Sequence, residues 1–385
     1  MSDQRSNIMD VFRGVAVLAV VLFHYTDRVP FSALRYENPI FPGWWSWGWV
    51  GPYWFFIISG FFMAASIEKS KDLISFMGKR VSRIYPAYFV AILIIVATMA
   101  ILPPVSFPQW HYSSATPPLT DVVANFFFAT DIGFDYVDGA FWTLVVELKF
   151  YLFLSLFFFL VFKRKLEKTV TAFGFIAIAL GIVWTAVNAA ILNGQYLETL
   201  DKFNSVLQTV LISLDLPFFA SGMLTQLYFS TRSKSSLTLL IANIVVCCLV
   251  IMILSFGKPY AYEYAPRTVI VFLFVAALFY ALVSVPQFGK WFSSKLGHSL
   301  LAPFVRIGVV SYAWYLIHQN IGVTLIYHLN GLLPGWLSII IVLLATYLLG
   351  ELLARTVEWR YRKPFELSIV SIARALLPPY RSRPA

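Results

Sequence analysis

Long runs of apolar residues, separated by short polar segments, repeat along the whole chain. Each run holds about 18 to 25 residues, the length that an α-helix needs to cross a bilayer. The pattern therefore predicts a membrane-embedded bundle of about ten helices. The predicted spans are 8–25, 48–67, 84–102, 141–162, 169–192, 205–229, 237–256, 268–285, 308–329 and 337–355.

Composition supports this interpretation and excludes a large soluble domain. Hydrophobic residues make up 59% of the 385 residues and charged residues only 12%, about half the charged fraction of a typical soluble domain. We predict an all-α integral membrane fold with one transmembrane domain over residues 1–365. Residues 366–385 are predicted to form a short basic cytoplasmic tail.

The distribution of lysine and arginine predicts the orientation. Of the 29 basic residues, 22 lie on the side of the predicted N-terminus, five lie in the opposite loops, and two lie within spans. Cytoplasmic loops of membrane proteins carry such an excess, so both termini are expected to be cytoplasmic. The net charge of +10 then reflects topology and does not indicate a nucleic-acid partner.

The first predicted span carries Arg13 and His24 at membrane depth. Ionisable groups there are costly and often functional. Eleven residues of helix place both side chains on one face, about 16 Å apart. That arrangement suits a long anionic molecule that carries a thioester. Such a molecule would lie between the guanidinium at one end and the imidazole at the other. The alternatives are a structural histidine and an arginine that reaches the cytoplasmic surface beside Asp10.

Glu147 lies about 10 Å into the fourth span from its outer end, at a depth similar to that of His24. We predict it as the partner that orients or stabilises His24, although a purely structural role weighs equally. His318 lies in the ninth span and is predicted as a buried hydrogen-bonding residue, with a supporting role in the site left open.

A basic cluster, Lys79, Arg80 and Arg83, precedes the third span. Arg80 and Arg83 share a helix face, and guanidinium groups bind phosphates in bidentate geometry. We predict both as donor-binding residues; the positive-inside rule is the competing explanation. The sequence has no P-loop and no cluster with metal-ligand spacing, so no metal is expected.

The outer loop from residue 103 to residue 140 contains no lysine or arginine but carries Asp121, Asp131, Asp135 and Asp138. These carboxylates could bind hydroxyl groups of a glycan, although solvated loop acids are the simpler interpretation. The neighbouring first outer loop holds Trp44, Trp45, Trp47 and Trp49. An interfacial aromatic belt is the commoner use of such residues.

Five motifs in order resemble the acyltransferase-3 family of bacterial integral-membrane O-acyltransferases. They are DVFRG (10–14) with His24, FFIISGF (55–61), RVSRIYP (80–86), FWTLVVE (141–147) and SYAWYLIH (311–318). The resemblance covers nearly the whole chain. It implies a ten-helix core that transfers acyl groups from cytoplasmic acyl-CoA to a carbohydrate at the outer face. His24 would be catalytic, Arg13 essential, and Arg80 and Arg83 donor-site residues, with Glu147 also in the site.

Two features depart from the family pattern. Pro52 and Tyr53 follow Gly51, where an apolar residue commonly follows the glycine in the family, and this change is expected to reshape the acceptor entrance. The sequence is also expected to act without the extra extracytoplasmic hydrolase-like domain of some relatives, either by completing transfer with the membrane core alone or by handing the acyl group to a partner.

The sequence therefore predicts an inner-membrane O-acetyltransferase that uses acetyl-CoA or another acyl-CoA and modifies a cell-surface or exported glycan. Membrane lipids, and glycan-biosynthesis proteins, are the expected partners. His24 would act either as a base or through an acyl-imidazole. A transporter or flippase for a lipid-linked sugar is the competing function, because such a protein would line its path with the same polar groups.

Overall fold

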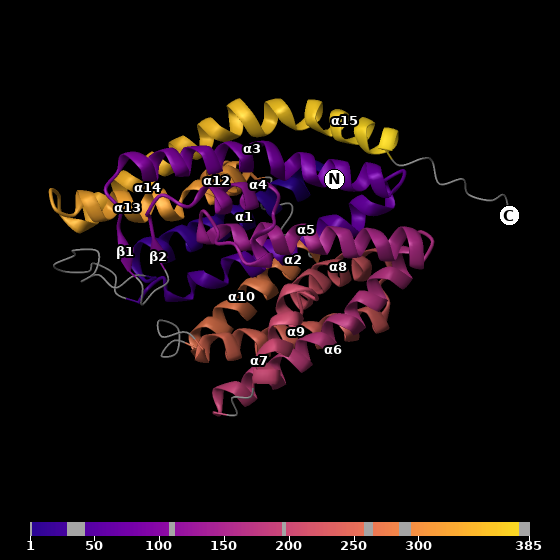
Figure 1. The fold of residues 1–385 in the computed structure, drawn as a ribbon. Coiled ribbons are helices and arrows are strands. Elements are labelled where there is room, and N and C mark those ends of the chain that lie inside the picture. The colour runs from indigo at the N-terminus through magenta and orange to yellow at the C-terminus, as the bar shows by residue number, and fades with distance from the viewer. Residues whose placement is uncertain are drawn as a thin grey trace.

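A computed structural model describes residues 2–28, 43–107, 112–194, 198–257, 265–284 and 294–376. The regular structure of these residues is helical apart from a short antiparallel pairing of β1 (Ser106–Phe107) with β2 (Tyr112–Ser113). Figure 1 shows the helices gathered into one bundle. The helices are α1 Ser2–Thr26, η1 Ser46–Val50, α2 Gly51–Glu68, α3 Leu73–Ile101, α4 Leu119–Phe126, η3 Thr130–Ile132, η4 Gly139–Phe141, α5 Trp142–Leu156, η5 Phe157–Val161, α6 Leu166–Leu192, α7 Glu198–Thr209, α8 Leu216–Thr231, α9 Lys234–Phe256, α10 Ala265–Ser284, α12 Lys295–Ile317, α13 Gln319–Leu329, α14 Gly335–Leu353, η7 Ala354–Glu358 and α15 Trp359–Leu376.

The predicted all-α membrane fold is confirmed. Within the described ranges, eight helical segments are long and apolar enough to cross a membrane, where helices satisfy their own backbone hydrogen bonds. The two remaining predicted spans correspond to the shorter helices α8 and α10. The predicted span 205–229 is wrong in its bounds, because α7 ends at Thr209 and α8 begins at Leu216, followed by Pro217 at a position that suits a helix start.

Helix α1 lies against α12 at very short range. A Cβ atom added to Gly308 would fall 1.7 Å from the Asp10 carbonyl oxygen, and one added to Gly14 would fall 2.2 Å from the Phe304 carbonyl oxygen. Small residues let helix backbones approach this closely inside a membrane. The crossing fixes the position of α1, which carries Arg13 and His24, relative to α12, which leads to His318.

The ninth predicted span is interrupted at His318, between α12 and α13. Asp138, fully buried in the outer loop, accepts hydrogen bonds from the backbone N–H of Ala140 at 2.8 Å and of Asn320 at 2.9 Å. A carboxylate at the start of a helix satisfies N–H groups that have no partner in the helix itself. Asp138 thereby ties the outer loop to the helix break at His318.

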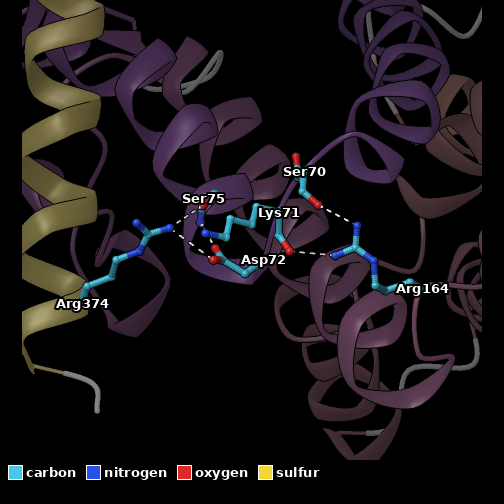
Figure 2. Close-up of polar contacts among 6 residues, drawn as sticks. All are labelled: Ser70, Lys71, Asp72, Ser75, Arg164 and Arg374. Atoms are coloured by element: carbon cyan, nitrogen blue, oxygen red, sulfur yellow. Dashed lines mark hydrogen bonds and ion pairs between the residues drawn. The ribbon is translucent and has the colours of Figure 1, made fainter. Parts of the chain in front are cut away.

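The opposite end of the bundle is held by two arginines that bind the segment between α2 and α3. Figure 2 shows Arg164 donating to the backbone carbonyls of Lys71 at 2.7 Å and Ser70 at 2.9 Å. Arg374 of α15 donates to Asp72 at 3.2 Å and to Ser75 Oγ at 3.0 Å.

Helix α15 lies along α3, as Figure 1 shows, so these contacts fix the start of the helix that carries Arg80 and Arg83. The predicted domain boundary at residue 365 falls inside α15, and residues 377–385 of the predicted tail lie outside the described residues.

Candidate active site

His24 is buried in the last turn of α1. Its Nδ1 lies 2.9 Å from the backbone carbonyl oxygen of Val20, one helical turn earlier. A carbonyl oxygen only accepts hydrogen bonds, so Nδ1 carries the proton. The neutral ring therefore has its lone pair on Nε2, the tautomer that a general base requires.

His318 lies beside His24 at the break between α12 and α13. Its Nε2 is 3.1 Å from His24 Nδ1, and its own Nδ1 is 2.7 Å from the carbonyl oxygen of Tyr315. The second contact places a proton on His318 Nδ1, which leaves Nε2 to accept from His24. The two bonds form a chain that fixes the orientation and tautomer of the His24 ring. The supporting role predicted for His318 fits this position.

Glu147 does not make the predicted contact with His24 within the described chain. Its carboxylate accepts hydrogen bonds from Ser59 Oγ at 2.9 Å and from Tyr151. Similar depth in the membrane was the basis of the prediction, and depth says nothing about which way a helix face points. The face of α5 that carries Glu147 turns toward Ser59 of α2, and the partner of His24 is His318, between α12 and α13.

Glu147 lines a small cavity together with Arg13 and Arg83. Arg13 is paired with Asp10 at 2.9 Å and lies over the Phe62 ring, 5.0 Å from its centroid. Arg83 makes no hydrogen bond or ion pair with another described residue. The cavity has a volume of about 80 Å³ and is otherwise walled mainly by apolar side chains. We refer to it as the arginine cavity.

Arg80 does not line the arginine cavity, although the sequence placed it with Arg83 on one helix face. Its guanidinium donates to Ser66 Oγ at 2.9 Å and lies over the ring of Phe76, at 5.6 Å. Its side chain points toward the α2 terminus.

A second cavity, of about 130 Å³, contains His24. We call it the histidine cavity. Its wall includes Arg28, Trp142, Tyr315 and Gln319. The Nε atom of Arg28 is buried and has no hydrogen-bond partner among the described residues. A guanidinium therefore stands in the same cavity as the candidate base, where it can stabilise negative charge.

Three cavities follow one another through the bundle. The arginine cavity and the histidine cavity share Pro52 and Tyr315 in their walls. The histidine cavity shares Gly139 and Gln319 with a third, polar cavity of about 630 Å³, which we call the outer cleft. The Tyr315 hydroxyl is bonded to the Ala140 carbonyl at 3.1 Å and to Thr143 at 3.2 Å. His24 thus lies between a cationic cavity and a polar one.

Sequence reasoning missed Arg28, Tyr315 and Gln319 as lining residues. Signals for them were present in the spacing. Arg28 follows His24 by four residues, just beyond the end of α1 at Thr26, and the two residues line the same cavity. Tyr315 and Gln319 flank His318 within the SYAWYLIH segment and directly after it. Pro52, noted as a departure from the family pattern, lies at the junction of the arginine and histidine cavities.

The buried carboxyl of Asp138 predicts a pH dependence of stability. Burial raises its pKa from 3.8 to about 6, against the opposing effects of its backbone hydrogen bonds and of nearby Arg28. Between these values the folded state keeps a proton that the unfolded state has lost, so stability falls as pH rises. The rise in pKa corresponds to about 3 kcal/mol.

Asp138→Asn, which cannot ionise, should lack this contribution. The thermal midpoint of the native protein, measured relative to that of the variant in nanodiscs, should fall between about pH 4 and about pH 6. Parallel curves for the two proteins would show that Asp138 does not titrate in this range.

The sequence also matches known proteins. A family model described as "Acyltransferase domain" matches residues 6–355. The chain is 24% identical over 379 residues to O-acetyltransferase OatA of Staphylococcus aureus, in strain NCTC 8325 / PS 47 and in strain COL. Each match covers 92% of this chain and 57% of the relative's length. The chain therefore spans little more than half the length of these relatives. No solved structure matches it.

Proposed function

Because the chain belongs to the acyltransferase-3 family, whose model matches residues 6–355, we propose that it is a membrane O-acetyltransferase. In this proposal it transfers an acetyl group from acetyl-CoA on the cytoplasmic side to a hydroxyl of a cell-surface or exported glycan. The observation that carries the proposal is the series of three cavities with His24 in the middle one.

The donor would enter through the arginine cavity. Arg83 makes no ion pair with a described residue, and Arg13, although paired with Asp10, lines the same cavity; both suit the phosphates of coenzyme A. The apolar walls formed by residues such as Phe56 and Phe62 suit the pantetheine arm. Arg80, one turn before Arg83, would act on the approach to this cavity.

The thioester carbonyl would reach the histidine cavity past Pro52 and Tyr315. There His24 Nε2 would take the proton from the acceptor hydroxyl, whose oxygen attacks the carbonyl carbon. The carbon–sulfur bond then breaks, and the coenzyme A thiolate leaves and recovers the proton from the imidazolium. Charge on His24 during this step is stabilised by the Val20 carbonyl and by His318 Nε2. Arg28 would stabilise the oxyanion that forms on the carbonyl.

The orientation belongs to the same proposal. With both termini in the cytoplasm, the arginines of α3 face the acetyl-CoA pool and the outer cleft faces the exported glycan. The inner membrane of a bacterium would be the location, and proteins of glycan biosynthesis would deliver the acceptor.

The chemical product distinguishes this function from a transporter or flippase. We expect the surface glycan of cells that express the chain to carry ester-linked acetyl groups, detected by mass spectrometry and removed by mild base. Cells that express His24→Asn at the same level should lack them. A transporter would change the amount of exported glycan in both strains without adding an ester, and that result would overturn the proposal.

A further inference from the structure

The outer cleft has the size and chemistry of a ligand site. Its volume of about 630 Å³ lies within the range of small-molecule pockets. The β1–β2 pair, the α4 region and the start of α13 contribute to its wall, and Figure 1 shows β1, β2 and α13 at one end of the molecule. Serine, threonine, tyrosine and amide side chains face it, which are groups that bind hydroxyls.

Gln319 stands where the outer cleft meets the histidine cavity, because it lines both. It is the first residue of α13, directly after the break at His318, and only 4% of its surface is exposed. Its side-chain amide makes no hydrogen bond with another described residue. The amide is therefore available to a ligand hydroxyl placed between the two cavities, because it can both donate and accept a hydrogen bond.

The backbone at Gly139 makes room for this amide. A Cβ atom built at Gly139 would lie 2.6 Å from Gln319 Nε2. Gly139 directly follows Asp138, whose two bonds fix both the outer loop and the start of α13. The fold therefore holds the Gln319 amide where the outer cleft meets the histidine cavity, on the proposed acceptor side of His24.

The charge of the outer cleft narrows the ligand class. Asp121 and Asp135 line it, and the loop from residue 103 to residue 140, which forms most of its wall, has no lysine or arginine. Such a surface repels anionic ligands and favours neutral or cationic ones.

We propose that the outer cleft binds the acceptor as a neutral or amino oligosaccharide, and that the Gln319 amide positions its reacting hydroxyl toward His24. This inference rests on the proposed acyltransferase function for the direction of transfer. The binding of the oligosaccharide itself does not depend on turnover. Gln319 acts here as a positioning residue, since the proton transfer belongs to His24.

A binding experiment tests the site without catalysis. The full chain in nanodiscs is titrated, without acetyl-CoA, with tri-N-acetylglucosamine, with the corresponding trimer of glucosamine and with trigalacturonic acid. We expect binding of the first two, weak or absent binding of the acidic trimer, and about a tenfold loss of affinity in Gln319→Leu. Gln208→Leu, a matched change on α7 outside the cleft, should bind normally. Equal binding by the native chain and Gln319→Leu, or no binding of any trimer, would overturn the proposal.

A double substitution in the protein tests the argument from charge. Asp121→Asn combined with Asp135→Asn should bring the affinity for trigalacturonic acid close to that for the neutral trimer. If the native chain prefers the acidic trimer, the proposed ligand class is wrong.

A kinetic experiment separates this inference from the proposed function. With acetyl-CoA present, Gln319→Leu should raise KM for the trimer about tenfold and change kcat less, whereas Gln208→Leu should leave both values unchanged. A structural defect would lower kcat and the thermal midpoint together and would contradict a positioning role. If the trimer binds in a Gln319-dependent way and is never acetylated, the inference stands and the proposed reaction fails.

Discussion

Replacing His24 with asparagine should reduce acetyl transfer at least about 1,000-fold. The asparagine amide can donate a hydrogen bond from near the position of Nδ1, so the contacts with the Val20 carbonyl and with His318 have a substitute. The variant has no atom in the place of Nε2. It therefore removes the base while it preserves the packing, and general-base catalysis contributes about 100- to 10,000-fold.

The measurement is acetyl transfer by the purified chain in nanodiscs, with the thermal midpoint checked in the same preparation. His328→Asn is the matched control, because His328 lies on α13 outside the lining of the histidine cavity, where it contacts the Pro103 carbonyl at 3.1 Å and the Tyr327 ring. Transfer by His24→Asn at more than a tenth of the native rate would exclude both a base and an acyl-imidazole at this position.

Local features of the sequence predicted much of the bundle. Apolar runs located the helices because burial in a membrane requires continuous apolar sequence and a self-bonded backbone. The pairing of Arg13 with Asp10 followed from their spacing on one helix, and it is present at 2.9 Å. Arg13 and Arg83 also share a cavity, as a common role in donor binding requires.

Contacts between helices could not be predicted in this way. Glu147 and His24 have similar depths, but helix rotation decides which residues meet, and rotation is set by close contacts such as Gly308 with the Asp10 backbone. Likewise, Arg80 and Arg83 share a helix face in projection, yet Arg80 donates a hydrogen bond to Ser66 of α2 and does not line the arginine cavity. A single sequence does not show which helix packs against a given face of another helix.

The break at His318 is the clearest case of a structural feature that depends on a residue far away in the sequence. Neither proline nor glycine occurs at residues 315–319, so hydropathy predicted one continuous helix. The interruption depends on Asp138, 182 positions away in the chain, which bonds the Asn320 N–H. His318, which contacts His24, and Gln319, which lines both the histidine cavity and the outer cleft, lie at this break. The active-site geometry is therefore a property of the outer loop as much as of the spans.

The second large effect is expected at Arg83, where alanine should raise KM for acetyl-CoA by about 10- to 100-fold. A hydrogen bond to a charged group contributes about 1.5–3 kcal/mol, and Arg83 makes no bond with a described residue that would have to break first. The effect should appear mainly in KM, because the phosphates lie far from the reacting carbonyl. Arg360→Ala on α15, which removes the same charge from an exposed site, should leave KM unchanged.

A truncated donor shows whether Arg83 acts through the phosphates. S-acetylpantetheine carries the thioester but no phosphate, so the native chain should use it far less well than acetyl-CoA. In Arg83→Ala that preference should shrink by the same factor by which KM for acetyl-CoA rises, because the missing phosphate and the missing guanidinium remove one and the same interaction. If the variant kept the full native preference, Arg83 would not contact the phosphates, and the arginine cavity would lose its assignment as the donor site. Since the cavity of Arg83 and that of His24 share Pro52 and Tyr315 in their walls, a positive result would also support an approach of the acetyl group to the base from the side of Arg83.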